Sequence, residues 1–404
     1  MKKRILSCLI VLCIVCLSAC GTENTGYSNN KKAYDMEKIY DTADALMNFN
    51  LKLLKQNFEQ TNLLLSPASV MDVLGMTANG ANGETLKVVE QILGAPVENI
   101  NEYCSWFRSD QNTDISMADS IWIRKDENIQ IQEAFLENVK KLYDTEIFEE
   151  AFSNRTVRKI NKWVSKKTDK MIPEILDNLK EDEMICLINA IAFDGEWENP
   201  YESYQVKPEK FYGENGGYKE IPFMRSTVSH YFEDADTTGF LKMYKGGKYG
   251  FVAFLPKEGM TMQQYLDTLT LEKYSDMMKN ITTEFAVYTK IPKFSMTYKK
   301  DLKDSLVKMG MELPFNSQAD FSKMAETENK NLYISRILHS TKIMVNETGT
   351  KAGASTAATM KTESAIEESR EFKEVVLNRP FIYVIMDMET KIPIFLGIMM
   401  EPEE

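Results

Sequence analysis

Apolar residues along this chain follow two spacings, one typical of helices and one typical of buried strands. Between Met36 and Leu54 they recur every three or four positions, which predicts an amphipathic helix packed on a core. The run Leu63–Leu65 predicts a short buried strand. A serine–proline step follows it, so we expect a helix to start there, with Ser66 or Ser69 available as its cap. Residues 115–147 indicate a strand, a turn and a second amphipathic helix.

Three later stretches extend this pattern. Residues 157–176 predict a helix whose many lysines and arginines form its solvated face rather than a binding patch, because its other side is apolar and carries Val157, Ile160, Val164 and Met171. Residues 184–201 begin with an apolar strand. Residues 378–402 predict a hairpin of two apolar strands.

The segment from Glu347 to Glu363 differs from all of these, since it has almost no large side chains, no proline and only two glycines. Its residues alternate between a small or apolar set and a more polar set: Thr350, Ala352, Ala354, Thr356, Ala358 and Met360 against Lys351, Gly353, Ser355, Ala357, Thr359 and Lys361. In a β-strand the small set would share one face. Alanine, glycine and serine are poor strand formers, however, so composition alone also allows a flexible linker.

Composition narrows the classes of function. The chain has 404 residues, of which 43% are hydrophobic and 27% charged, as in ordinary globular proteins. The net charge of -12 argues against general nucleic-acid binding. The only histidines are His230 and His339, and no metal-ligand, phosphate-loop or serine-hydrolase motif is present. We therefore expect no enzyme, no metal and no cofactor.

The N-terminus predicts export. Lys2, Lys3 and Arg4 precede an apolar run of thirteen residues, Ile5–Leu17, which is too short to span a bilayer. The following sequence, Leu-Ser-Ala-Cys-Gly, resembles a bacterial lipobox. We expect residues 1–19 to be a signal peptide, Cys20 to be lipidated and residues 20–34 to be a polar tether. The protein would then be anchored outside the cytoplasm of a bacterium, on the extracellular face or in the periplasm. An ordinary signal peptide with a chance cysteine is the alternative.

After removal of such a signal, Cys104 and Cys186 are the remaining thiols. A disulfide between them is conceivable, but two cysteines give no framework, and we expect two unpaired thiols.

Several motifs follow one another in a fixed order. They are Asn-x-x-x-Ser-Pro-x-Ser at 62–69, Gly-Ala-x-Gly-x-Thr at 80–85, Trp-Val-x-x-x-Thr-x-x-x-Ile at 163–172 and Asn-Ala-x-x-Phe-x-Gly-x-Trp at 189–197, and the C-terminal hairpin closes on Pro402. In these residues and in their order the chain resembles the serpin family, from about residue 36 to 404.

The resemblance implies a mixed α+β fold. It comprises a large central β-sheet, two smaller sheets, about eight or nine helices and an exposed reactive loop at about 347–371, all in one domain from 35 to 404. It also implies an irreversible suicide-substrate inhibitor, acting as a monomer on serine proteases, with cysteine proteases as a further target class. The protease cleaves the loop and forms an acyl-enzyme, and the freed loop inserts as a new strand into the large sheet.

The opening pattern of residues 347–363 meets the requirements of such a loop. The hinge residues would be Glu347, Gly349, Thr350, Ala352 and Ala354, with small side chains on the buried parity. Gly349 would supply backbone freedom. No proline before Glu363 interrupts the strand.

The scissile bond follows from a count. In typical inhibitory members the residue before the cut is the seventeenth from the position of Glu347, which gives Glu363–Ser364. A glutamate there suits a glutamyl-specific or a broad, subtilisin-like protease. Residues 364–380 look longer than in most members, which weakens counts from the C-terminal side. Lys361–Thr362 and Arg370–Glu371 are trypsin-like alternatives.

By family pattern, Ser66, Ser69, Asn189 and His339 would form a polar network, the shutter, beneath the strands that must separate. For His339 a satisfied core histidine is the plain alternative, and here the two interpretations nearly coincide.

Trp197 would lie where the loop first enters, and Lys293 would pair with Glu347 at the base of the loop. A solvated charge is the alternative for this lysine and this glutamate.

Two other classes of function stay open. A non-inhibitory serpin, acting as a binding or chaperone module, usually carries charged, bulky or proline residues in the hinge, and this chain does not. An unrelated enzyme finds no catalytic motif here.

Overall fold

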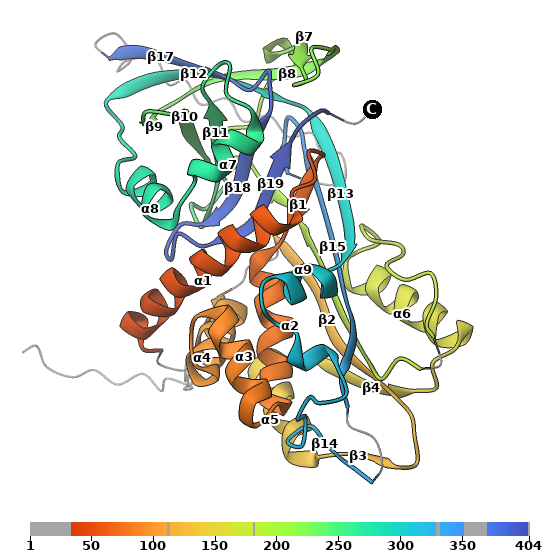
Figure 1. The fold of residues 1–404 in the computed structure, drawn as a ribbon. Coiled ribbons are helices and arrows are strands. Elements are labelled where there is room, and N and C mark those ends of the chain that lie inside the picture. Colours follow the sequence, from red (N-terminus) through yellow and green to blue (C-terminus); the bar gives the residue numbers. More distant parts are fainter. Residues whose placement is uncertain (1–33, 111–113, 181, 329–331, 351–369, 403–404) are drawn as a thin grey trace, which may run out of the picture. The chain divides into compact units, whose positions relative to one another are not determined.

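The computed structural model describes residues 34–110, 114–180, 182–328, 332–350 and 370–402 (Figure 1). The chain divides into two units, Met1–Tyr34 and Asp35–Glu404, and every element below belongs to the second. The predicted signal peptide and Cys20 lie outside the described residues.

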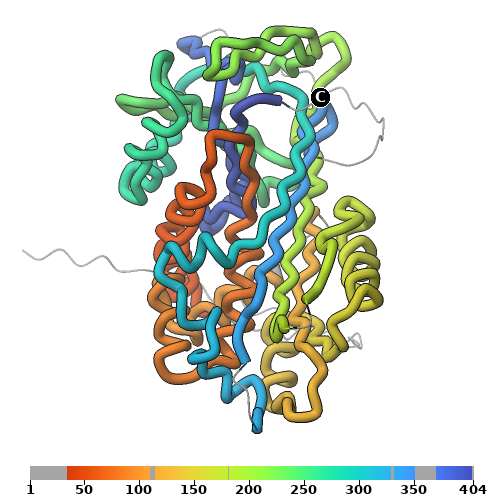
Figure 2. Tube along the Cα trace, turned by 45° about the vertical axis from the view of Figure 1, so that its right-hand side comes forward, coloured from red at the N-terminus to blue at the C-terminus, as the bar shows by residue number. Residues whose placement is uncertain are grey.

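The large sheet has seven strands. Its order is β4 (Glu146–Glu150), β2 (Ile115–Arg124), β5 (Ile185–Phe193), β15 (Ile334–Val345), β16 (Gly349–Thr350) and β6 (Gly195–Glu196), and β13 (Phe294–Asp301) also pairs with β15. β5 and β15 are direct parallel neighbours from Ile334↔Ile185 to Lys342↔Ala192. Figure 2 shows β13, β15 and β5 side by side as long extended segments. Every residue of β5 is buried, as its continuous apolar run predicts.

The six-stranded sheet is antiparallel throughout. Its order is β1 (Leu63–Leu65), β19 (Pro393–Met399), β18 (Phe381–Asp387), β11 (Tyr249–Pro256), β10 (Thr237–Met243) and β9 (His230–Glu233). The predicted C-terminal hairpin is β18–β19, and both strands are completely buried. The predicted strand before the serine–proline step is β1, at the edge of this sheet.

A four-stranded sheet has the order β17 (Glu371–Val376), β12 (Phe285–Pro292), β8 (Tyr218–Val228) and β7 (Val206–Tyr212). A two-stranded ribbon, β3 (Ile129–Ile131) with β14 (Ala325–Thr327), was not predicted. One large and two smaller sheets are therefore confirmed, with this ribbon in addition.

Nine α-helices occur in the described part of the chain. They are α1 (Met36–Asn57), α2 (Pro67–Gly80), α3 (Gly83–Leu93), α4 (Val97–Asp110), α5 (Glu133–Tyr143), α6 (Asn154–Lys167), α7 (Met262–Thr268), α8 (Leu271–Lys279) and α9 (Lys303–Lys308), and two 3-10 turns add Ser203–Gln205 and Leu313–Phe315. Nearly all of α2 is buried, and it contacts β2, β5 and β19. Ser66 is its N-cap and accepts a hydrogen bond from the Ser69 amide at 3.4 Å.

The prediction of one helix over 157–176 was wrong at its C-terminal end. α6 ends at Lys167, because Asp169 and Lys170 have positive φ angles of 47° and 64° and cannot continue a right-handed helix. Val157, Ile160 and Val164 of the predicted apolar side are buried in a core cluster with Trp122 of β2. Met171 is also buried but lies beyond the end of the helix, and the cations of α6 are exposed.

Candidate functional site

The described part of the hinge already forms a short strand in the large sheet. In β16, Thr350 pairs with Val345 of β15, and Gly349 and Thr350 pair with Glu196 and Gly195 of β6, antiparallel on both sides. β6 follows β5 after a single residue, Asp194. A continuation of β16 would therefore run between β5 and β15, antiparallel to both.

Thr350 is fully buried in this arrangement. Its hydroxyl lies 2.6 Å from the hydroxyl of Tyr244, so the buried oxygen has a partner. Tyr244 in turn stacks on Trp197, with ring centres 4.5 Å apart. Thr350 is thus buried against Tyr244, which together with Trp197 forms an aromatic wall at the hinge.

Close packing gives a second reason for glycine at position 349, which was not predicted. Gly349 has no positive φ in this state, so its present conformation does not itself call for glycine. A Cβ at this residue would lie 2.0 Å from the carbonyl oxygen of Gly195. Glycine allows the hinge backbone to approach β6 closely.

Trp197 holds the turn that leads into the hinge. Its indole Nε1 donates to the Asn346 carbonyl at 2.9 Å, and its amide donates to the Thr348 carbonyl at 2.9 Å. The Tyr201 amide donates to the Glu347 carbonyl at 2.8 Å. Three carbonyls of the turn are therefore bound by the segment that follows β6.

The side chain of Glu347 meets Lys293 as expected, with Nζ 2.6 Å from Oε1 and both side chains about one third exposed (33% and 32%). Burial alone would raise the pKa of Glu347, but the hydrogen bond from Lys293 holds it below its ordinary value.

A buried cation, Lys242 of β10, was not predicted. Its Nζ donates to the Asn199 carbonyl at 3.1 Å and lies 4.5 Å from the ring centre of Tyr201 and 5.4 Å from that of Trp197. Burial lowers its pKa to about 8. A lone lysine between a leucine and a methionine in a mostly buried strand gives no sequence signal of this role.

The structure brings Ser66, Ser69, Asn189 and His339 together, and all four are fully buried. The Ser66 amide donates to His339 Nε2 at 3.1 Å, and Asn189 Nδ2 donates to the Ser69 carbonyl at 2.7 Å. His339 Nδ1 contacts Asn189 Oδ1 across the β5–β15 junction. Burial lowers the pKa of His339 to about 3, so its ring is neutral. We keep the name polar network for these four residues.

Three charged residues beside the polar network were missed: Asp72 of α2, Arg108 of α4 and Asp119 of β2. Arg108 Nη2 lies 2.6 Å from Asp72 Oδ2 and 2.7 Å from Asp119 Oδ2. In the sequence each aspartate is a single carboxylate within an apolar run, and this pattern could have indicated a buried acid that needs a partner. Their common partner could not be found, because it lies on a separate element.

Two hinge residues and most of the predicted reactive bonds lie outside the described residues. This applies to Ala352, Ala354, Lys361, Thr362, Glu363 and Ser364. The alternative Arg370–Glu371 is described: Arg370 is exposed, and Glu371 is the first residue of β17, paired in register with Phe285.

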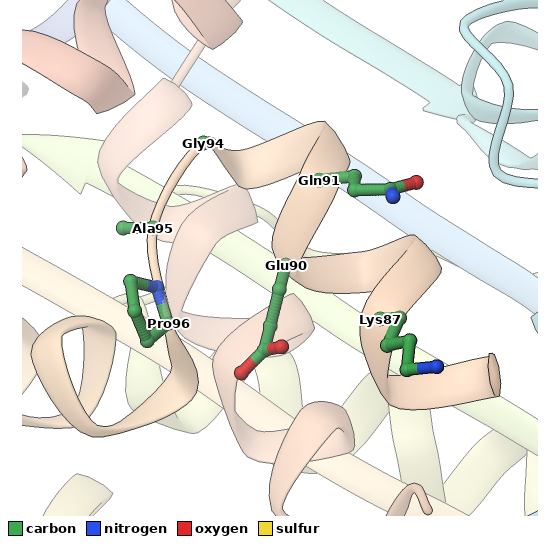
Figure 3. A pocket seen from close by; sticks show the side chains of 6 residues that line it. All are labelled: Lys87, Glu90, Gln91, Gly94, Ala95 and Pro96. Carbon is green, nitrogen blue, oxygen red and sulfur yellow. The ribbon is translucent and has the colours of Figure 1, made fainter. Parts of the chain in front are cut away.

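Other candidate sites carry no comparable chemistry. In the described residues no group of three or more potential ligands could hold a metal ion, and no helix is long and apolar enough to cross a membrane. A depression of about 430 Å³ at the end of α3 is open to solvent and includes no hinge or network residue; Lys87, Glu90, Gln91, Gly94, Ala95 and Pro96 line it (Figure 3). Cys104 and Cys186 are free and buried.

Comparison with known proteins gives one consistent result. The family model described as Serpin (serine protease inhibitor) matches residues 44–402. Human Serpin B4 is 29% identical over 89% of this chain and 100% of its own length, and a serpin-like protein of Thermococcus kodakarensis is 28% identical over 89% and 86%. The crystal structure of the thermophilic serpin tengpin in its native state superposes with a TM-score of 0.84 at 37% identity, covering 92% of this chain and 96% of that one. The chain therefore belongs to the serpin family, whose members are generally protease inhibitors rather than enzymes.

Proposed function

We propose that this chain is an irreversible suicide-substrate inhibitor of serine-type endopeptidases. A target protease would cleave the reactive loop, and the freed loop would insert between β5 and β15 while still joined to the protease as an acyl-enzyme. The observation that carries this proposal is β16: the hinge already pairs on both sides at the entrance to that junction.

The side-chain parity of the hinge supports insertion. Thr350 faces the buried aromatic wall, and in a continued strand every second residue faces the same side. Those residues include Ala352 and Ala354, which are small enough for a packed interior. The new strand would gain ladder hydrogen bonds along both neighbours, each worth about 0.5–1.5 kcal/mol net. The uncut protein would then be metastable and kinetically trapped.

We further propose Glu363–Ser364 as the bond that is cleaved. The count from Glu347 supports it, and Lys361–Thr362 is the nearest alternative. Arg370–Glu371 is a poorer substrate, because Glu371 is held in β17 by the four-stranded sheet. A protease needs an extended, accessible segment on both sides of the bond.

The place of action is part of the proposal. A lipid on Cys20 would anchor the protein to a bacterial membrane, outside the cytoplasm, and residues 20–34 would act as a tether. Support comes from the signal-like sequence alone. Cys20→Ala should move the protein from the membrane fraction to the soluble one; equal distribution of both variants would contradict the anchor.

The decisive experiment mixes the protein with a subtilisin-like, a glutamyl-specific and a trypsin-like protease. A band at the summed mass on a denaturing gel would show covalent trapping, and mass spectrometry of the C-terminal peptide would identify the cleaved bond. Cleavage without such a band in all three mixtures, at excess of this protein, would contradict the proposal for these protease classes. The melting temperature of the cut product separates the inhibitory from the non-inhibitory hypothesis further. Insertion of the cut loop should raise it strongly, and a non-inhibitory binding module should show no such rise.

A further inference from the structure

Asp72, Arg108 and Asp119, which we call the carboxylate cluster, join three elements of the fold next to the polar network. Both carboxylates are essentially unexposed, at 1% and 0%, and the arginine side chain is 18% exposed. One guanidinium nitrogen, Nη2, is within 2.7 Å of an oxygen from each of them. Two buried carboxylates therefore share a single arginine.

The charges around the cluster do not balance it. From α4 the neutral Cys104 thiol and Tyr103 phenol face it, and from α5 the Tyr143 phenol. Burial raises the pKa of all three further above neutral pH. The His339 ring of β15 is neutral too, so no second cation compensates the two acids among the described groups that act on them.

A buried site with two carboxylates and one cation holds a proton near neutral pH. Burial, offset only in part by Arg108, raises the pKa of Asp72, and it raises the pKa of Asp119 to about 7. The two acids titrate as one coupled pair. The geometry decides which of them keeps the proton.

Asp119 is the carboxylate with more hydrogen-bond donors around it. It accepts hydrogen bonds from Asn189 Nδ2 at 2.6 Å, from Arg108 Nη2 at 2.7 Å and from Ser69 Oγ at 3.5 Å. Asp72 has fewer donors: the close contact with Arg108 Nη2 at 2.6 Å and the weak donor Cys104, and no amide or hydroxyl group of the described chain donates to it. The charge therefore belongs on Asp119 and the proton on Asp72.

The charge on Asp119 fixes the orientation of the Asn189 amide. Because Nδ2 points to Asp119 and the Ser69 carbonyl, Oδ1 points to His339 across the β5–β15 junction. His339 Nε2 accepts from the Ser66 amide, so the ring proton is on Nδ1 and is donated to Asn189. A flipped Asn189 amide would present two N–H groups to that ring proton and break the bond.

We propose that Asp119, held by Arg108 and by a proton on Asp72, is a positioning residue that keeps the β5–β15 junction closed against insertion of the uncut loop. This rests on the proposed function, because insertion between these two strands is the event that the bond between Asn189 and His339 opposes. Loss of the shared proton places two negative charges on one arginine, so Asp72 and Asp119 compete for Arg108 and the position of Asp119 beside Asn189 is held less firmly.

The sign of the pH dependence follows from linkage. The ordinary pKa of an aspartate is 3.8, so above about pH 4 the unfolded chain has released a proton that the native cluster keeps. The stability that the shared proton contributes is therefore largest below about pH 4 and falls as pH rises and the cluster releases that proton.

The test compares the full chain with Asp72→Asn, a neutral isostere of the protonated acid, and with Glu98→Gln, which removes an exposed acid of α4, the helix that carries Arg108. We would follow the spontaneous conversion of uncut protein into a heat-stable, loop-inserted form between pH 5 and 7.5. The rate should rise about tenfold over this range in the parent chain and in Glu98→Gln, and stay flat and low in Asp72→Asn. Asp119→Asn should convert faster than the parent at pH 5, with no pH dependence.

Superimposable pH profiles of the parent and Asp72→Asn would overturn the proposal, and so would a slow, pH-dependent conversion of Asp119→Asn. If Asp119→Asn does not fold, the Asp72→Asn comparison still decides. Thermal unfolding of the same variants needs no protease. A pH dependence that Asp72→Asn removes would thus support the cluster even if no protease complex forms, whereas a complex without that dependence would overturn the cluster alone.

Discussion

The hinge end of the large sheet and its centre are closed by different kinds of contact. At the hinge end, β16 separates β15 from β6, and the contacts are backbone pairs, carbonyls bound by Trp197 and an aromatic stack. At the centre, β5 and β15 pair directly, and a buried polar chain runs through Asn189 and His339. In the first region a strand already lies between β15 and β6, and in the second the proposed insertion would still have to separate β5 from β15.

This difference assigns separate tasks to the two regions. Under the proposed mechanism the hinge end would select which residues enter, because Thr350 is buried against Tyr244, which stacks on Trp197. The centre would decide when the strands separate, because a buried hydrogen bond would have to break before a new strand could pass. A change at the hinge end should therefore affect the outcome of cleavage, and a change at the centre should affect the stability of the uncut protein.

The largest expected effect is at the hinge. Thr350→Arg places a charge against the buried aromatic wall, where it has neither space nor a partner. The loop should still be cut but no longer insert, so covalent complex on a denaturing gel should fall at least about 100-fold, a barrier change of about 3 kcal/mol. Thr350→Ser keeps the hydroxyl and should retain the complex. Trapping by Thr350→Arg at the parent level would contradict the insertion mechanism.

At the centre, His339→Ala leaves the Ser66 amide and the Asn189 oxygen buried without partners. We expect a loss of about 2–4 kcal/mol in the first unfolding transition in urea, with faster spontaneous insertion. His230→Ala is the matched control, since the other histidine is only half-buried at the start of β9. Equal losses of stability in the two variants would contradict a special role of the polar network at the sheet centre.

The sequence predicted the centre in part. The serine–proline step and the Asn189 motif identified the polar network through the family pattern. Asp72, Arg108 and Asp119 escaped, because their contact joins α2, α4 and β2, and no local spacing encodes which cation meets which acid. The three sheets and the number of helices followed from the family resemblance, and apolar periodicity predicted single elements such as α1, α5 and β5. The end of α6 depends on two residues with positive φ that look ordinary in sequence.

At the hinge end the sequence predicted the residues better than their reasons. Gly349 was expected to let the chain bend, which stays a prediction, and its close approach to Gly195 was not anticipated. The pairing of β16 with β6 could not be anticipated, because two-residue strands carry no periodicity.

A smaller effect is expected for Gly349→Ala. The added Cβ would lie 2.0 Å from a backbone oxygen, so the hinge must leave β6 or the strands must shift, at about 1–3 kcal/mol. The measurable result is faster limited proteolysis of the loop and a lower melting temperature. Gly213→Ala is a control, because its Cβ would meet only the end of the Asn215 side chain, at 3.1 Å. Unchanged proteolysis in Gly349→Ala would mean that β16 does not persist in solution.

The smallest effect separates charge from backbone pairing at the hinge. Lys293→Met keeps most of the side-chain packing but removes the contact with Glu347, which is about one third exposed and so worth about 0.2–1 kcal/mol. Since this contact lowers the pKa of Glu347, its contribution is present above the ordinary pKa of 4.5 and is lost as pH falls below it. High salt should weaken it likewise. Lys245→Met removes the more exposed pair with Glu196, at 73% and 43%, and should change the melting temperature less. If Lys293→Met instead lowered stability as much as Gly349→Ala, the ion pair rather than the backbone pairing would hold the hinge. Charged side chains would then control loop entry at the hinge as well as at the centre of the large sheet.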